Sequence, residues 1–273
     1  MKKGVKAGCL IVFIALLCAA AYLINAFFGN PVSAYLAKRA AQAYLAEHYA
    51  HLDVEIERFG YSFKTADYYA HVSSPTSMDT HFSIYMRMNG EVRYDTYDSV
   101  TSGWNTWQRL ESEYRARTKA LFDVPDFELR NDIAFGSLEL KEESVYDYQP
   151  VPFGIDLQTL ELDREYDINE LAAQAGKIVF YMQHEDVSFE TAARGMLRLK
   201  EILDGEGIPF FAMDFVLRLP REEGQPGNGG PVIHVQDFLY SEIDEDGMTQ
   251  RVQAAHEALD AFYEELDRKE KAE

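Results

Sequence analysis

The sequence predicts an α+β protein in which an N-terminal transmembrane helix is followed by two small α+β domains. Two observations carry this prediction. The chain begins with one long apolar run, and the residues after it change repeatedly between the helical period of about 3.6 and the strand period of about 2. With 273 residues, of which 47% are hydrophobic, the chain can form more than one core. We therefore expect an anchor at 1–30, a first domain at 31–123 and a second domain at 124–273.

The apolar run from Ala7 to Phe28 is long enough to cross a membrane. It contains no charged residue, and as a helix that rises about 1.5 Å per residue it extends about 33 Å, close to the thickness of a bilayer core. A cleaved signal peptide has a shorter apolar region, of about 7–15 residues, followed by small residues such as Ala19–Ala21. Because apolar residues continue to Phe28, we favour an uncleaved signal anchor.

The charges on either side of the run predict its orientation. Lys2, Lys3 and Lys6 precede it, whereas Lys38 and Arg39 follow it at a distance. Loops rich in lysine and arginine remain in the cytoplasm. We therefore expect a single-pass protein of the cell membrane with a cytoplasmic N-terminus and an extracytoplasmic body.

The two cysteines, Cys9 and Cys18, both lie in the anchor, so the body forms no disulfide. Neither follows a lipoprotein cleavage pattern. Cys9 comes after Lys6-Ala7-Gly8 with no apolar region before it, and Cys18 comes after Ala15-Leu16-Leu17, which has a large residue where a small one is needed.

The chain is strongly acidic, with a formal net charge of −20 at pH 7. Such a body repels phosphate backbones and anionic lipid headgroups, which excludes nucleic acid as a partner. The acidity also has a plain explanation, because net charge keeps proteins soluble.

Residues 31–122 show the pattern of one small domain, with a helix, a four-stranded meander and a second helix. A change in the phase of the alternation at Arg58 indicates a β-bulge, and Asn89-Gly90 indicates a two-residue hairpin loop with positive φ. Trp104 and Trp107 could form a ligand platform, but we assign them to the core or its rim. The expected elements are a helix at 32–49, strands at 54–63, 68–72, 82–88 and 92–96, and a helix from Thr101 or Ser102 to Phe122.

The second domain has a different element order. After a stretch of short alternations at 125–152, the strand–helix–strand–strand–helix order resembles most of a ferredoxin-like split unit. The expected elements are an extended segment at 155–162, a helix from Asp167 or Asn169 to Ala175 closed by Gly176, a strand at 178–182, a helix at 188–205, strands at 209–219 and 232–243, and a helix at 249–269.

Histidine pairs are the first candidates for a metal site. His256-Glu257-Ala258-Leu259-Asp260 differs from the HExxH zinc motif because Asp260 replaces the second histidine. The neighbouring apolar residues make an ordinary amphipathic helix the better interpretation. His48 and His51 have a spacing that could pair on a metal, but at a helix end we expect them to be solvated.

Two loops resemble ion or phosphate sites in composition alone. Asp244–Gly247 concentrates carboxylates before a helix but lacks the ligand spacing of a calcium loop. The segment Gly224–Pro231 is rich in glycine, yet it leads into a strand rather than a helix and has no Lys-Ser/Thr after it. We interpret it as a hairpin connection.

No residue set predicts catalysis. The chain has no GxSxG elbow, and the body contains no cysteine nucleophile. The sequence therefore assigns no catalytic, cofactor-binding or metal-binding residue and no cofactor, and we expect a protein that is not an enzyme.

Several segments resemble a known family. The exit Gly29-Asn30-Pro31 after a single anchor, the helix end Tyr44–Tyr49, the strand Phe59–Lys64 and the pattern Phe215–Leu219 before an acidic helix are similar to the YfjL-like membrane-anchored proteins of Firmicutes. The resemblance implies a bacterial cell-surface location and supplies no site residues. The first domain is also similar to cystatin-like or PepSY-like modules, which bind partners rather than catalyse.

Two functions from different classes remain. The first is a membrane-anchored extracytoplasmic binding or regulatory module for an envelope protein or peptide. The alternative is an extracytoplasmic hydrolase or metal-dependent enzyme with a site between the domains. The anchor and the lack of a catalytic set favour the first.

Overall fold

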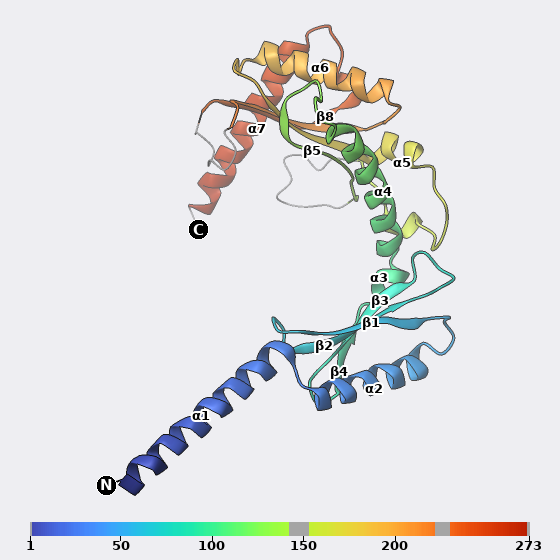
Figure 1. Cartoon of the computed structure of the whole chain (residues 1–273). Helices are drawn as coiled ribbons and strands as arrows, with labels where there is room; N and C mark the ends of the chain where they lie inside the picture. Colours follow the sequence, from blue (N-terminus) through green and yellow to red (C-terminus); the bar gives the residue numbers. More distant parts are fainter. Residues whose placement is uncertain (1, 142–152, 222–229, 272–273) are drawn as a thin grey trace. The chain divides into compact units, whose positions relative to one another are not determined.

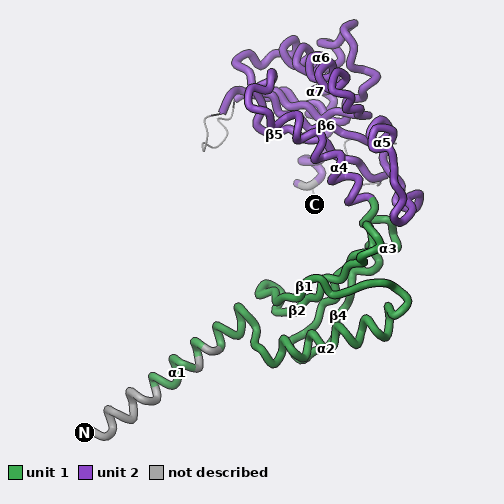
Figure 2. Tube along the Cα trace, turned by 45° about the vertical axis from the view of Figure 1, so that its right-hand side comes forward, with its two compact units in different colours: residues 1–106 green, residues 107–273 purple. Residues whose placement is uncertain are grey.

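The computed structural model describes residues 2–141, 153–221 and 230–271. The chain divides into two compact units, Met1–Thr106 and Trp107–Glu273, which Figure 2 shows in two colours. Each unit contains one four-stranded sheet. The predicted α+β class, with an apolar N-terminal helix and two small mixed units, is confirmed.

The chain begins with the long helix α1 (Lys2–Phe28), visible at the N-terminal end in Figure 1. Its apolar side chains do not pack into a core: Leu16 is 64% exposed, Tyr22 72% and Phe28 77%. One helical stretch in the described part of the chain is long and apolar enough to cross a membrane, and it includes most of α1. The predicted apolar helix is therefore confirmed, and exposed side chains of this kind suit a lipid environment.

The residues after α1 start a second helix directly. Asn30 is the N-cap of α2 (Pro31–His48), because its side-chain oxygen accepts a hydrogen bond from the backbone N–H of Ser33 at 2.9 Å. Pro31 fits the first helical position, where no N–H is needed. The hydroxyl of Tyr68 in the sheet contacts both the backbone of Asn30 and the hydroxyl of Ser33, which attaches the start of α2 to the sheet.

The first sheet is an antiparallel meander in the order β1-β2-β3-β4. Helix α2 covers one of its faces, where Ala37 and Ala41 are fully buried and let the helix approach closely. Inward residues of the central strands complete this core: Tyr68, Ala70, Val72, Phe82, Ile84 and Met86. The elements are β1 (Glu55–Ser62), β2 (Asp67–Ser73), β3 (His81–Met86), β4 (Val92–Asp95) and the short helix α3 (Asp98–Thr101).

Two turn predictions have different outcomes. The bulge is confirmed, because the register of β1 on β2 shifts between Ile56 and Arg58. The prediction of a two-residue hairpin loop at Asn89-Gly90 is wrong. The N–H of Arg87 donates to the carbonyl of Glu91 at 2.8 Å, and only Gly90 of the pair has positive φ, at 87°. The connection is thus a three-residue loop that uses a single left-handed glycine.

The helix predicted from Thr101 or Ser102 to Phe122 is confirmed, but it begins at Trp104. Gly103 has a φ of 81°, which separates α3 from α4 (Trp104–Phe122). The apolar residues Leu110, Tyr114 and Phe122 belong to the core of the second unit. The predicted first domain ended at 123, whereas the compact units divide after Thr106, since most of α4 packs with the residues that follow it.

The second unit has the sheet order β5-β6-β7-β8. β6 and β7 are parallel neighbours in the sheet, and α6 is the crossover helix that connects them. A ferredoxin-like split unit would place another strand between them, so this part of the prediction is wrong. The expected extended segment at 155–162 is wrong, since it contains a 3-10 turn and a single bridge from Ile155 to Leu140. The elements are β5 (Asn131–Leu138), η1 (Leu157–Thr159), α5 (Ile168–Ala175), β6 (Gly176–Gln183), α6 (Phe189–Gly205), β7 (Ala212–Arg218), β8 (Val232–Leu239), η2 (Tyr240–Glu242) and α7 (Met248–Glu270).

Candidate functional site

The first edge of the second sheet, β5, is covered by side chains of α4. The backbone N–H of Gly136 donates to the hydroxyl of Thr118 at 2.8 Å, and the indole N–H of Trp107 donates to the carbonyl of Leu138 at 3.1 Å. These contacts satisfy ladder groups that an edge strand otherwise leaves open.

The opposite edge, β8, is covered by α7. His256 Nδ1 lies 3.1 Å from the carbonyl oxygen and 3.4 Å from the backbone nitrogen of His234. Whichever tautomer His256 adopts, its ring occupies this edge. At both edges of the second sheet, side chains from a helix therefore contact backbone N–H or C=O groups of the edge strand.

The edge strand β1 of the first sheet is different. It pairs with β2 on one side, and within the described residues no backbone hydrogen bond reaches its other side. The residues Glu55, Glu57 and Arg58, near the start of β1, are exposed to solvent. A row of free N–H and C=O groups on an edge is a template for pairing with another strand.

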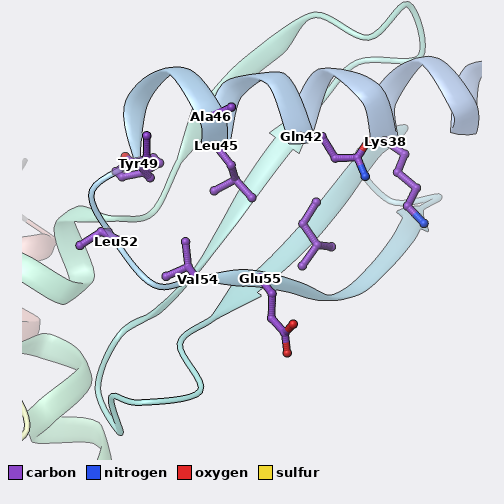
Figure 3. Close-up of a pocket in the computed structure, with 10 residues that line it drawn as sticks. Lys38, Gln42, Leu45, Ala46, Tyr49, Leu52, Val54 and Glu55 are labelled. Carbon is purple, nitrogen blue, oxygen red and sulfur yellow. The ribbon is translucent and has the colours of Figure 1, made fainter.

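A groove of about 470 Å³ lies between this edge and α2 (Figure 3). Leu45 on α2 and Val54 next to β1 point toward each other across it, whereas Glu55 points away from the helix. Lys38 and Gln42 lie farther along the same helix. The remaining lining residues are Ala46, Tyr49, Ala50, Leu52 and Ile56. An apolar floor with a few polar groups is the usual character of a binding groove.

The helix side of the groove is held in place by one carboxylate. Asp95 Oδ2 accepts hydrogen bonds from the hydroxyls of Tyr44, at 2.7 Å, and Tyr49, at 2.8 Å, while Oδ1 accepts the backbone N–H of Tyr97. Partial burial acts to raise the pKa of Asp95, but the hydrogen bonds from Tyr44, Tyr97 and Tyr49 lower it below its ordinary value. The end of α2 is thereby fixed to the end of β4.

The same contacts shift both phenols. The hydrogen bond to Asp95, with burial, raises the pKa of Tyr44 to about 12. Burial, followed by the hydrogen bond to Asp95, raises the pKa of Tyr49. Both hydroxyls stay protonated and act as donors, so Tyr49 serves the groove as a fixed wall.

A second pocket, of about 580 Å³, lies in the second unit beside β5. At its base the ammonium of Lys177 lies 3.2 Å from Glu139, 3.3 Å from Asp237 and 3.7 Å from Asp214. Burial raises the pKa of Asp214 to about 6, although Lys177 and the backbone N–H of Asp237 oppose the shift. Asp237 has a left-handed φ of 52°, and its N–H donates to Asp214 at 2.7 Å. The charges thus hold a bulge between β7 and β8.

The serine of this pocket already has a hydrogen-bond partner. The hydroxyl of Ser137 donates to Glu139 at 2.7 Å, and Ser137 pairs with Lys177 across the strands. Burial acts to lower the pKa of Lys177, but Asp214, Glu139 and Asp237 raise it above its ordinary value. The ammonium of Lys177 is therefore held in its charged form by three carboxylates.

The histidine candidates do not converge on a metal. His256 Nε2 lies 3.5 Å from Asp260, but its other nitrogen contacts the backbone of His234. The ring of His48 packs 4.3 Å from that of Tyr44, and His51 is exposed in the following turn. In the part of the chain that the structure describes, no group of three His, Cys, Asp or Glu residues is placed to hold a metal ion.

The two loop candidates have separate outcomes. The acidic turn Asp244–Gly247 is organised by Arg251, whose guanidinium bonds the carbonyls of Glu242, at 3.0 Å, and Asp244, at 2.9 Å, and pairs with the Asp244 carboxylate at 3.0 Å. Most of the glycine-rich segment Gly224–Pro231 lies outside the described residues. Of the two tryptophans, Trp107 is half-buried and donates its indole N–H to the carbonyl of Leu138 on β5.

Comparison with known families identifies the chain. Residues 2–96 match the family model described as YfjL-like, N-terminal domain, and residues 113–253 match that of the YfjL-like C-terminal domain. The chain belongs to the YfjL-like family. No curated protein and no solved structure matches this YfjL-like chain. The family resemblance expected from the sequence is confirmed, and the similarity of its first domain to cystatin-like or PepSY-like modules stays a prediction.

The groove of this YfjL-like protein was not predicted from its sequence. The signal that could have found it is the alternation Asp53-Val54-Glu55-Ile56-Glu57, in which two apolar residues are separated by acids at the start of a strand. The sequence predicts Val54 and Ile56 only as part of a strand; in the structure both are half-buried, pack against the first core and line the groove.

Proposed function

We propose that this YfjL-like protein is a membrane-anchored extracytoplasmic binding or regulatory module that captures an extended segment of an envelope protein or peptide. The observation that carries the proposal is the free edge of β1 beside the groove under α2. The three other edge strands are less suited to pairing. Side chains of helices cover β5 and β8, and β4 is short, with 4 residues.

An extended segment would add to β1 as a fifth strand. Its backbone would pair with the free N–H and C=O groups, and alternate side chains would enter the groove beside Leu45, Val54 and Ile56. Main-chain pairing of this kind supplies affinity for many sequences, and the pockets select among them.

The anchor supports this function by its position. The carbonyl of Ala26, near the end of α1, accepts a hydrogen bond from Tyr61 of β1 at 3.1 Å, and the rings of Phe27 and Phe63 are 5.9 Å apart. If α1 crosses the membrane as the lysine pattern predicts, the C-terminal end of β1 lies at the outer surface of that membrane. Segments of envelope proteins close to the bilayer are within its reach.

Site-specific photocrosslinking in intact cells tests the proposal. A photoreactive residue at Glu55 is expected to give discrete adducts with an envelope protein. Replacing Ala46, an exposed residue that lines the groove, with tryptophan should abolish these adducts. Ala43→Trp is the matched control, because Ala43 is also exposed on α2 but does not line the groove.

Adducts that persist in Ala46→Trp, or that disappear equally in Ala43→Trp, would contradict capture in the groove. A failure to form any adduct at position 55 would contradict it as well. Mass spectrometry of the adduct should locate the crosslink within a short segment, since strand addition uses few residues.

A further inference from the structure

The two faces of the free edge carry different chemistry. Val54 points toward α2, and Glu55 points away from it (Figure 3). Because side chains alternate along an extended chain, Ile56 shares the face of Val54, and Asp53 shares the face of Glu55. Glu57 is the extra residue of the bulge, and it lies on the outer face as well, since its carboxylate is 3.7 Å from His71. The edge therefore presents apolar residues on the groove side and a row of three carboxylates on the outer side.

The three carboxylates lack a strong cationic partner. Asp53, Glu55 and Glu57 are all exposed, and within the described residues no lysine or arginine forms an ion pair with any of them. Glu57 lies 3.7 Å from Nε2 of His71, and Asp53 accepts a hydrogen bond from Thr76 at 3.4 Å. Their negative charge is thus available to a neighbouring strand.

The length of the open edge is limited toward the C-terminal end of β1. Toward the C-terminal end of β1, Tyr61 contacts Ala26 of α1. Beyond Glu57 the charge of the outer face changes sign, because the next residue is the exposed Arg58. Arg58 lies opposite His71 in the register of β1 on β2. The acidic row therefore spans about five residues, which is the length of an ordinary short strand.

We propose that the segment captured by β1 is alternately apolar and basic over about five residues. This inference rests on the proposed function. The apolar residues enter the groove, and the lysine or arginine residues pair across the strands with Glu55 and Glu57. Opposite charges placed directly across a ladder stabilise it, and like charges destabilise it. The acidic row therefore selects against alternately apolar and acidic segments.

Peptide binding to the full chain in nanodiscs of zwitterionic lipid tests the charge pattern, because such lipid does not attract basic peptides. The probes are two fluorescently labelled peptides of about nine residues. Valine alternates with lysine in one and with glutamate in the other, and fluorescence anisotropy measures their binding. The wild-type chain is expected to prefer the lysine peptide by about tenfold. The double variant Glu55→Lys/Glu57→Lys should reverse the preference.

The control variant is Glu185→Lys/Glu206→Lys, which makes the same change of net charge at two exposed positions of the second unit. It should keep the preference of the wild type. If the control loses the preference as the edge variant does, the whole acidic body attracts the peptide and the inference is overturned. If both peptides bind equally and Ala46→Trp abolishes both, strand capture stands but the charge pattern is wrong. Binding of neither peptide in the groove, with Ala46→Trp without effect, would overturn the inference together with the proposed function.

Discussion

The backbone N–H of Gly136 on β5 donates a hydrogen bond of 2.8 Å to the hydroxyl of Thr118 on α4, and both groups are buried. The contact is possible because position 136 has no side chain. A Cβ there would lie 2.6 Å from Thr118 Cγ2 and 2.7 Å from the ring of Tyr114. Tyr114 and Thr118 are 1% and 0% exposed, so neither can move aside easily.

Gly136→Ala is therefore expected to destabilise the second unit by about 1–3 kcal/mol, the usual cost of overpacking a close-packed core. Urea unfolding followed by circular dichroism measures the loss. Gly205→Ala is the matched control, because a Cβ at position 205 meets nothing within 4 Å. This helical glycine should tolerate alanine without loss, and a Gly136→Ala variant as stable as Gly205→Ala would show that α4 shifts freely on β5.

Asp95→Asn tests the carboxylate that holds α2 to β4. An amide oxygen can accept from Tyr44 or Tyr49 but not from both with the strength of a charged acceptor, so the expected cost at pH 7 is about 1–2 kcal/mol. The exposed Asp98→Asn is the control and should cost a few tenths of a kcal/mol. Equal stability of the two variants by urea unfolding would mean that the tyrosine contacts contribute little.

The same cluster predicts how stability depends on pH. The folded-state pKa of Asp95 is below its ordinary value, so its contribution is present above about pH 4 and is lost as the pH falls through the folded pKa. The pKa of Tyr44 is raised from 10.0 to about 12. Its contribution is complete below pH 10 and is lost as the pH rises toward 12. The gap in melting temperature between wild type and Asp95→Asn should therefore close at both extremes, and a constant gap would be the contrary result.

Asp214→Asn is expected to stabilise the second unit near neutral pH. Burial raises the pKa of Asp214 from 3.8 to about 6, so its ionisation reduces stability as the pH rises from about 4 to about 6. Asparagine keeps an acceptor for the N–H of Asp237 and removes one of three negative charges around Lys177. The variant should match wild type near pH 4 and exceed it by about 1–3 kcal/mol at pH 7–8. A variant less stable than wild type at pH 7 would mean that the ion pair with Lys177 outweighs desolvation.

Sequence periodicity predicted most elements because their apolar residues face one core. Ser188 and Asp167 cap α6 and α5, and Gly176 closes α5, as expected from local chemistry. Periodicity cannot show which core a helix face contacts. For that reason α4 was assigned to the first domain, although Leu110 and Tyr114 pack in the second unit.

The candidate site was not predictable from the sequence for a related reason. A free edge is the absence of a neighbour, and a strand pattern such as that of β1 is the same whether one or both of its sides are paired. Likewise, Thr118 and His256 gave no sign in the sequence that they would cover β5 and β8, because their roles depend on tertiary packing.

The orientation that we expect for the apolar helix leads to a final prediction, which cysteine labelling can check. Both natural cysteines lie in the anchor segment, so replacing Cys9 and Cys18 with alanine gives a chain without thiols. A single Thr65→Cys, at an exposed position between β1 and β2, should react with a membrane-impermeant maleimide in intact cells, because the lysines before the apolar helix predict a cytoplasmic N-terminus. Lys3→Cys in the same background should react only after lysis. The opposite pattern would place the free edge of β1 in the cytoplasm and exclude an envelope protein as its ligand.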